Sequence, residues 1–321
     1  MKVLITGGAG YIGSVTTAYL LDNGFEVNVL DNLSTGHEKF IDKRAEFFFG
    51  DILENDSVIS SMSGCDAVVH LAAKTIISES VLKPDFYMEN NYTGTVNILN
   101  SMKKLLVNKL VFSSSCAVYG NPISKLIAED HPTNPINPYG ESKLFADNEI
   151  GRFSRENKLK SVSLRFFNVG GSYRSSVNNV YGELHNEETH LIPKILNNKS
   201  VNIYGRDFDS PDGTCVRDYV HVVDLACAIK LSLEIKNLEH HKIYNLGSGN
   251  GASVLEVIKV AEKVIFSEII KYDGLPKNGD PAYLVADSKL ANTELGWKSE
   301  LSLNKIIEDS YAFNQALDLE I

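Results

Sequence analysis

Residues 2–14, KVLITGGAGYIGS, decide the fold, because an apolar, β-branched run leads directly into a glycine-rich turn and then a helical pattern. Gly7, Gly10 and Gly13 give the spacing G-x-x-G-x-x-G. Glycines permit a tight turn and let backbone amides approach a pyrophosphate, which then lies at the positive N-terminus of the helix. A glycine run alone also occurs in flexible turns, but the flanking strand and helix favour a dinucleotide site.

Outward from this turn, short apolar runs alternate with longer amphipathic stretches, which indicates strands joined by crossover helices. The expected strands are residues 2–6, 26–31, 45–50, 66–72, 109–115 and 161–167. Each is apolar on both faces, as in a parallel sheet buried under helices on both sides. The expected helices include residues 12–23, ended by Gly24 as a C-cap, and residues 86–106.

The rhythm changes beyond Asn168, where residues 170–190 are polar and lack periodicity, so we expect a long functional loop there. Residues 220–234 and 241–249 resemble a helix and a strand that rejoin the sheet. The predicted fold class is therefore α/β, with a Rossmann-like, doubly wound parallel sheet and a smaller C-terminal substrate-binding domain. The predicted division is residues 1–168 with 218–248 for the dinucleotide, and 169–217 with 249–321 for the substrate.

Composition excludes several classes of protein. The chain has 321 residues, 43% of them hydrophobic, and a formal net charge of -10, which argues against a nucleic-acid partner because phosphate backbones are bound by basic surfaces. The four cysteines have no C-x-x-C spacing and no histidines at zinc-finger intervals, so we expect reduced thiols, a cytoplasmic protein and no metal site. The sequence shows no long apolar run, so we expect neither a secretion signal nor a membrane span.

An acidic residue at the end of the second expected strand indicates which dinucleotide binds. Asp31 follows Gly13 by 18 residues, where a carboxylate accepts hydrogen bonds from both hydroxyls of the adenine ribose. Asp31 would repel a ribose phosphate, and the next residue is Asn32 rather than arginine, so NAD is favoured over NADP. Asp51 and Ile52 follow the third strand and are placed to meet the adenine, although a plain strand-to-helix turn looks similar.

Three hydroxyl and amine side chains indicate the chemistry. Ser115 ends the fifth expected strand, at the sheet edge where open parallel sheets bind ligands. Tyr139 and Lys143 lie four residues apart at the start of a helical pattern, so they share one face. Hydride transfer from a sugar or alcohol carbon needs a base for the hydroxyl proton, and an ammonium beside a phenol favours the phenolate. Each residue alone also fits an ordinary surface or loop position; the set of three favours catalysis.

The chain resembles the extended short-chain dehydrogenase/reductase family in its glycine run, in FSSSCAVYG at 112–120 and in NPYGESK at 137–143. IYGRDFDSPDGTCVRDYVHVVDLA at 203–226 is similar to one branch, the UDP-glucose 4-epimerases, and the likeness covers nearly the whole chain. That resemblance implies transient transfer of the C4 hydride of a UDP-hexose to NAD and its return to the opposite face, without net redox. It also implies a homodimer and a role in galactose metabolism.

The resemblance also implies roles for individual residues. Tyr139 is the base, Lys143 tunes it and holds the nicotinamide ribose, and Ser115 bonds the sugar oxygen. The expected cofactor contacts are completed by Tyr11, Ile12, Leu71, Ala72, Ala73, Lys74, Asn90 and Phe167. The expected UDP-sugar contacts are Asn168, His190, Leu191, Asn202, Ile203, Tyr204, Arg217, Lys277 and Leu284.

The sequence departs from the family pattern at four positions. Lys277 and Asn278 stand where members often have an arginine pair that clamps the diphosphate, and Thr75 stands where enterobacterial members have lysine. Leu284 replaces a tyrosine that fills the space around the sugar C2 group in some members, so we expect UDP-glucose and UDP-N-acetylglucosamine both to be epimerised. Packing of Leu284 into the domain core is the alternative.

Rival functions remain on the same scaffold. A nucleotide-sugar dehydratase or decarboxylase is the nearest, but dehydratases of that kind carry an Asp-Glu pair after the fifth strand, where this chain has Ser115 and Cys116. A non-catalytic dinucleotide sensor would be free to lose Ser115, Tyr139 or Lys143, and all three are present. A third rival is a ketoreductase that releases its cofactor in each turnover.

Overall fold

The computed structural model describes residues 1–185, 188–238, 240–276 and 280–318. Its centre is a sheet of seven strands in the order β14-β7-β5-β4-β1-β2-β3, and every neighbouring pair is parallel. The strands are β1 (Lys2–Thr6), β2 (Glu26–Asp31), β3 (Glu46–Phe49), β4 (Ala67–His70), β5 (Lys109–Ser115), β7 (Lys160–Phe166) and β14 (His241–Leu246). The predicted α/β fold with a Rossmann-like parallel sheet is confirmed.

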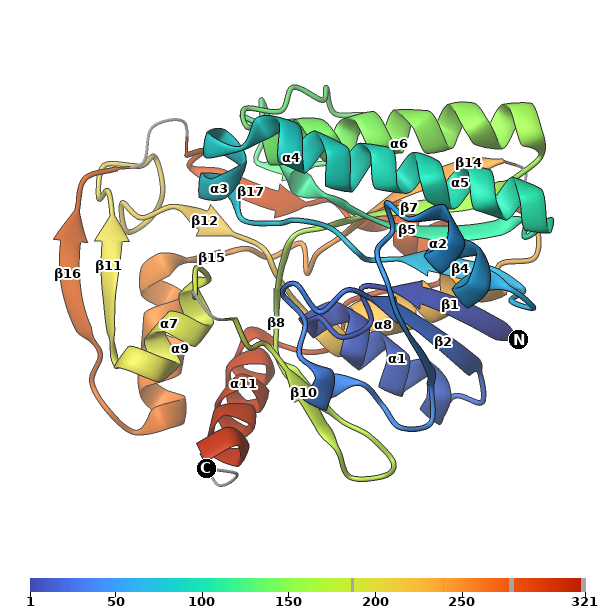
Figure 1. The fold of residues 1–321 in the computed structure, drawn as a ribbon. Coiled ribbons are helices and arrows are strands. Elements are labelled where there is room, and N and C mark those ends of the chain that lie inside the picture. Colours follow the sequence, from blue (N-terminus) through green and yellow to red (C-terminus); the bar gives the residue numbers. More distant parts are fainter. Residues whose placement is uncertain (186–187, 239, 277–279, 319–321) are drawn as a thin grey trace.

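Helices cover both faces of this sheet (Figure 1). On one face, α1 (Tyr11–Asp22) and α8 (Val222–Glu234) pack side chains such as Leu20 and Leu225 against the strands, and α10 (Lys289–Leu295) joins them. On the other face lie α2 (Asn55–Met62), α5 (Gly94–Leu105) and α6 (Pro138–Asn157). Two apolar clusters thus sandwich the strands, which explains why the strand sequences are apolar on both faces.

Three predictions about individual strands and helices need correction. The outermost strand β3 is not buried on both faces, because Phe49 is 72% exposed at the sheet edge. The C-cap of α1 is Asn23, and Gly24 follows it with φ +80°, which glycine adopts without strain. Residues 86–106 are interrupted helix: after α3 (Ile77–Leu82) come α4 (Pro84–Met88), a π-helical turn η2 (Glu89–Thr93) and α5.

A second group of elements lies beyond the carboxyl edge of the sheet. Its core contains Ile203, Val257 and Ile306, from β11, α9 and α11. The bounds are β8 (Asn168–Gly170), β9 (Ser172–Arg174), β10 (Val180–Gly182), α7 (Leu191–Asn198), β11 (Ser200–Tyr204), β12 (Val216–Arg217), β13 (Tyr219–His221), β15 (Ala252–Ser253), α9 (Val254–Ile265), β16 (Ile270–Gly274), β17 (Tyr283–Ala286), α11 (Leu303–Asp318) and β6 (Leu126–Ile127), which pairs with β17; η1 (Glu38–Phe40) and η3 (Cys116–Tyr119) lie elsewhere.

The segment 170–190, predicted to be a loop, contains an antiparallel pair, β9 and β10. Tyr181 in β10 is only 2% exposed and packs in a cluster with Phe40 and Phe313. These partners come from distant segments, and the neighbours of Tyr181 in the sequence are polar. Its burial therefore could not be predicted from the local sequence.

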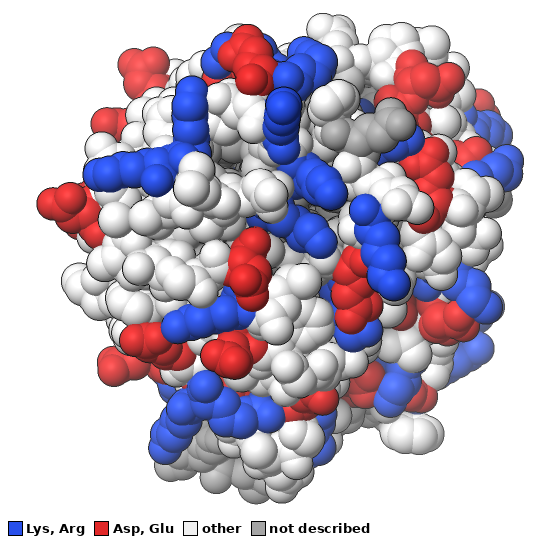
Figure 2. Space-filling model, turned by 90° about the vertical axis from the view of Figure 1, so that its right-hand side faces the viewer, with Lys and Arg blue, Asp and Glu red and all other residues white. Residues whose placement is uncertain are grey.

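Surface charge is mixed on the face shown in Figure 2, where basic and acidic side chains are interspersed. Among the described residues, no helix combines the length and the apolar character needed to span a membrane.

Candidate active site

The glycine turn is closely packed, which requires residues without side chains. A Cβ on Gly13 would lie 2.0 Å from the carbonyl oxygen of Gly7, and one on Gly7 would lie 2.7 Å from the amide nitrogen of Ala72. Gly7 also has φ +74°. The segment 71–73 is fixed beside the turn, because the Leu71 amide donates to the Thr6 carbonyl at 3.1 Å. The turn and segment 71–73 thus fit a dinucleotide pyrophosphate.

Asp31 lies at the carboxyl end of β2 beside this turn and is 9% exposed. Its Oδ2 accepts the Ala9 amide at 3.0 Å and its Oδ1 accepts the Leu33 amide at 2.8 Å. Burial raises the pKa of this carboxyl, and the two amides and Lys74 oppose the rise. Each oxygen keeps a second lone pair, so the carboxylate has two acceptor sites left for a diol.

Asp51 and Ile52, which were predicted to meet the adenine, have different surroundings in the structure. Asp51 accepts a hydrogen bond from the Asn32 side chain at 2.7 Å, so the residues after β2 and β3 are joined. Ile52 is 5% exposed and packs so tightly against α5 that a Cβ on Gly94 would lie 2.5 Å from its Cδ1. The Ile52 side chain therefore serves the core, and its backbone is the part that remains for a ligand.

Lys74 and Asn90 meet through Asn91, which the sequence analysis did not single out. The Asn91 side-chain oxygen accepts the Lys74 amide at 2.8 Å and the Asn90 side-chain amide at 2.9 Å. Asn91 also donates to the Ser142 hydroxyl at 2.9 Å, which ties this group to α6. Asn90 and Asn91 lie in the π-helical turn, a deviation that frequently marks functional sites and that alters which faces side chains share.

Ser115 and Tyr139 come together at the carboxyl edge of the sheet. The start of α6 is fixed by Asn137, whose side chain accepts the Gly140 amide at 2.8 Å, and by Pro138 at the first helical position. This places Tyr139 in hydrogen-bonding contact with the hydroxyl of Ser115. Lys143, one turn along α6, is 2% exposed, and its ammonium donates to the Ser113 carbonyl at 2.7 Å.

The expected lowering of the Tyr139 pKa is wrong for the protein alone. Burial raises the pKa of Tyr139 to about 12, although the hydrogen bond from Ser115 opposes the rise. The Lys143 ammonium is bonded to Ser113, and burial lowers the pKa of Lys143 to about 8. Desolvation therefore outweighs the attraction on which the sequence argument relied.

Asp147 is a supporting residue that the sequence analysis missed. It lies one turn beyond Lys143, is 2% exposed, and accepts hydrogen bonds from the Ser114 hydroxyl at 2.8 Å and from Arg165 Nε at 3.2 Å. Its negative charge opposes the lowering of the Lys143 pKa. The signal was the spacing of Lys143 and Asp147 on one helix face.

Arg217 connects the second group of elements to the sheet edge. Its guanidinium pairs with Asp280 at 2.6 Å and donates to the Pro281 carbonyl at 2.8 Å. It lies near enough to Cys116 to affect the pKa of that thiol, which burial raises to about 12. Arg217 also pairs in register with Leu284, across β12 and β17.

Leu284 is partly buried and packs against the cluster that contains Cys116 and Phe167. Asn168 begins β8, and its side chain is hydrogen-bonded to Tyr219. These residues border the same sheet edge as Ser115, because Ser115 pairs with Phe166 in the β5–β7 register.

The other predicted UDP-sugar residues lie on α7 and β11. His190 caps α7, Leu191 begins it, and Asn202 and Tyr204 are exposed along β11. Ile203 between them is 1% exposed in the core, so its side chain is directed away from a ligand. Lys277 lies outside the described residues. The glycine turn contacts this region through Tyr11, whose hydroxyl donates to the Gly171 carbonyl at 2.6 Å, while Ile12 packs in the core.

Comparisons with known proteins agree with this geometry. A model of the NAD dependent epimerase/dehydratase family matches residues 3–247. The UDP-glucose 4-epimerase of Corynebacterium glutamicum is 42% identical over 99% of this chain and 97% of its own length. A crystal structure of UDP-glucose-4-epimerase from Stenotrophomonas maltophila, with bound NAD and formylated UDP-arabinopyranose, superposes with a TM-score of 0.95 at 33% identity over 100% of both chains. The UDP-Glc/GlcNAc 4-epimerase of Campylobacter jejuni superposes with a TM-score of 0.85 at 33% identity, over 98% of this chain and 99% of that one.

Proposed function

Because the chain belongs to the NAD dependent epimerase/dehydratase family, in the branch of the UDP-glucose 4-epimerases, we propose that it interconverts the C4 epimers of a UDP-hexose. The observation that carries the proposal is the contact between Ser115 and Tyr139 at the carboxyl edge of the sheet, one helical turn from Lys143. Relatives with this function match the chain along nearly its whole length.

NAD is the proposed cofactor, and when bound it would supply the acceptor and donor for the hydride of the sugar C4. The closely packed glycines and segment 71–73 fit its pyrophosphate, and Asp31 has two acceptor sites for its adenine ribose. We assign NAD binding to residues 1–168 with 218–248. Residues 169–217 and 249–321 are assigned to the UDP-sugar.

Tyr139 is the proposed base for the C4 hydroxyl proton. A base is needed because the C4 carbon becomes a carbonyl, so the hydroxyl must lose its proton as the hydride leaves. Ser115, already hydrogen-bonded to the phenol, would hold the same sugar oxygen. Lys143 would add a positive charge that favours the phenolate, and the buried carboxylate of Asp147 helps to keep it protonated.

Two features support a UDP-sugar in the second group of elements. Arg217 is oriented by its ion pair with Asp280, near the thiol that follows Ser115, and would donate to a diphosphate at the sheet edge in competition with Asp280. Asn168 begins β8, and His190 is the N-cap residue of α7. We further propose that the space beside Leu284 admits an acetamido group, because a leucine is shorter than a tyrosine. The relative from Campylobacter jejuni is described as a UDP-Glc/GlcNAc epimerase.

A dehydratase is less well supported. Elimination needs an acid and a base near neutral pH at the position after β5, where this chain has Cys116. Burial raises the pKa of the Cys116 thiol to about 12, which makes it a poor proton donor or acceptor at neutral pH. The position thus favours epimerisation over elimination.

A homodimer is proposed through the outer face of α4 and α6. Phe86 and Phe145 are 40% and 46% exposed there, and Phe145 lies against Tyr92 with 6.0 Å between ring centroids. Exposed aromatic side chains on neighbouring helices are typical of a two-fold interface. Sedimentation of the wild type as a dimer and of Phe145→Glu as a monomer would support this; a monomeric wild type at micromolar concentration would contradict it. The proposed location is the cytoplasm.

The test is to incubate the purified protein with UDP-glucose or UDP-galactose, without added cofactor, and to separate the nucleotide sugars. Interconversion in both directions is expected. Release of reduced cofactor in proportion to sugar consumed would indicate a ketoreductase, and accumulation of a dehydrated sugar would indicate a dehydratase.

A further inference from the structure

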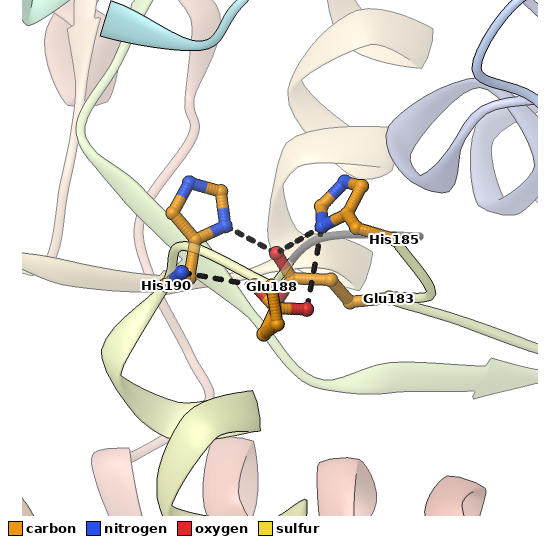
Figure 3. A group of neighbouring side chains, drawn as sticks. All are labelled: Glu183, His185, Glu188 and His190. Atoms are coloured by element: carbon orange, nitrogen blue, oxygen red, sulfur yellow. Dashed lines mark hydrogen bonds and ion pairs between the residues drawn. The ribbon is translucent and has the colours of Figure 1, made fainter. Parts of the chain in front are cut away.

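Four metal-ligating side chains converge between the end of β10 and the start of α7. They are Glu183, His185, Glu188 and His190, and one ligand atom of each lies within 4.8 Å of all the others (Figure 3). Both imidazoles direct Nδ1 toward the carboxylate of Glu183, as Figure 3 shows. The sequence predicted no metal site, because its four cysteines lack C-x-x-C spacing and histidines at zinc-finger intervals.

The distances in this cluster suit a small divalent cation. A tetrahedral site with bonds of about 2.0–2.2 Å separates neighbouring ligand atoms by roughly 3.4 Å. His185 Nδ1 lies 3.5 Å from Glu183 Oε1 and 3.4 Å from Glu188 Oε2. His190 Nδ1 is hydrogen-bonded to the same Oε1 of Glu183, so these two atoms must move apart to admit an ion.

The carboxylates are already oriented. Glu183 and Glu188 have side chains only 7% and 13% exposed, unlike acidic groups that merely extend into solvent. The second oxygen of Glu188 accepts the amides of Thr189 and His190, each at 2.9 Å, which directs Oε2 toward His185. Such hydrogen bonds to a ligand are the outer support that fixes metal sites.

We infer that Glu183, His185, Glu188 and His190 bind one zinc-class divalent cation. Two imidazoles and two carboxylates match the ligands of zinc and of cobalt(II), whereas calcium and magnesium prefer sites made of oxygen alone. The imidazoles bind in their neutral form, and each gives up any proton on Nδ1 to solvent as the ion enters.

A cation at this site would coordinate only one of the two ring nitrogens of His190. Coordination through Nδ1 leaves the proton on Nε2, which makes His190 a fixed donor at the first turn of α7. The cation thereby connects β10 to α7, beside the residues proposed to hold the UDP-sugar. Metal binding itself needs neither sugar nor turnover, so it is measured separately from the proposed function.

The test is a titration of chelator-treated, desalted protein near pH 7. Zinc is followed by calorimetry, and cobalt(II) by the visible absorption of a four- or five-coordinate ion. One equivalent should bind and should raise the Tm. His185→Gln and Glu183→Gln should each weaken binding at least about a hundredfold, because loss of an outer-shell partner alone weakens it about ten- to a hundredfold.

His240→Gln is the matched control, because it removes an exposed imidazole just before β14 and should leave metal affinity unchanged. Near-ultraviolet circular dichroism confirms that each variant is folded. Absence of saturable binding to the wild type would overturn the inference by itself, even if a variant failed to fold. Equal affinity in the wild type and in folded His185→Gln would also overturn it.

Discussion

Replacing Asp31 with alanine is expected to weaken NAD binding by about a hundredfold or more and to strengthen NADP binding. Each carboxylate oxygen of Asp31 accepts one backbone amide, at 3.0 and 2.8 Å. Since a carboxylate has about four acceptor sites, two remain, one for each hydroxyl of the adenine ribose.

The magnitude follows from these two sites. A hydrogen bond to a charged group contributes about 1.5–3 kcal/mol, so two contribute at least about 3 kcal/mol, which is about 150-fold in affinity. A ribose phosphate cannot use both sites, and a unit charge about 4 Å from the carboxylate is repelled by about 4 kcal/mol at an effective dielectric constant of 20. Alanine removes the repulsion together with the hydrogen bonds, so the preference for NAD should shrink.

Calorimetric titration of cofactor-stripped protein with NAD and NADP provides the measurement. It is made at pH 8 so that Asp31 is ionised, because burial raises the pKa of this carboxyl. Asp66→Ala is the control, since Asp66 also accepts a backbone amide, that of Lys2 at 2.7 Å, but at the amino edge of the sheet. Equal dissociation constants of the wild type for NAD and NADP would refute the reasoning, as would unchanged NAD affinity in Asp31→Ala.

Three further substitutions test the proposed chemistry. Tyr139→Phe should lower kcat by about a hundredfold to ten-thousandfold with NAD affinity retained, and an active variant would remove Tyr139 as the base. Lys143→Met should move the rise of kcat with pH to higher pH, because the base is the deprotonated Tyr139 and the lysine charge favours deprotonation. A rise of kcat at an unchanged pH would contradict this. The Lys143 pKa, lowered from 10.5 to about 8, means that the unfolded state binds more protons between these values. The free energy of unfolding of the wild type should therefore rise with pH between these two pKa values. The Tm of Lys143→Met should exceed that of the wild type at pH 7, and this difference should shrink by pH 10. A difference in Tm that stays constant with pH would contradict the lowering of the Lys143 pKa by burial. Leu284→Tyr should remove turnover of UDP-N-acetylglucosamine and retain turnover of UDP-glucose. The wild type should use these two substrates with efficiencies within about a hundredfold of each other, because small groups in apolar pockets discriminate by only about 1–3 kcal/mol. Equal loss of both activities in kinetic assays would contradict this use of Leu284.

The sheet could be predicted from the sequence because burial on both faces leaves continuous apolar runs. All six expected strands formed, and β14 joined the sheet as its seventh strand. The prediction of burial on both faces failed for β3, because the place of a strand in the sheet decides how exposed its side chains are. Phe49 belongs to an apolar run but lies on the outermost strand. It also failed at Tyr181, whose buried partners are distant in the sequence.

The candidate site was predictable as a set of residues but less so as chemistry. Ser115 and Tyr139 were found from their motifs, and the structure places them in contact. The direction of the Tyr139 pKa was wrong because burial, which a motif does not show, dominates. Asn91 escaped notice because its role depends on the π-helical turn, and the Glu183 cluster because its residues do not follow a cysteine-containing metal motif.

The central claim is that the hydrogen at C4 leaves and returns within one closed cycle. It is tested most directly with UDP-glucose carrying deuterium at C4, incubated with the purified protein in ordinary water and without added cofactor. Nuclear magnetic resonance and mass spectrometry of the UDP-galactose formed should show the deuterium retained at C4. Loss of the label to solvent, or its appearance in released reduced cofactor, would contradict the account.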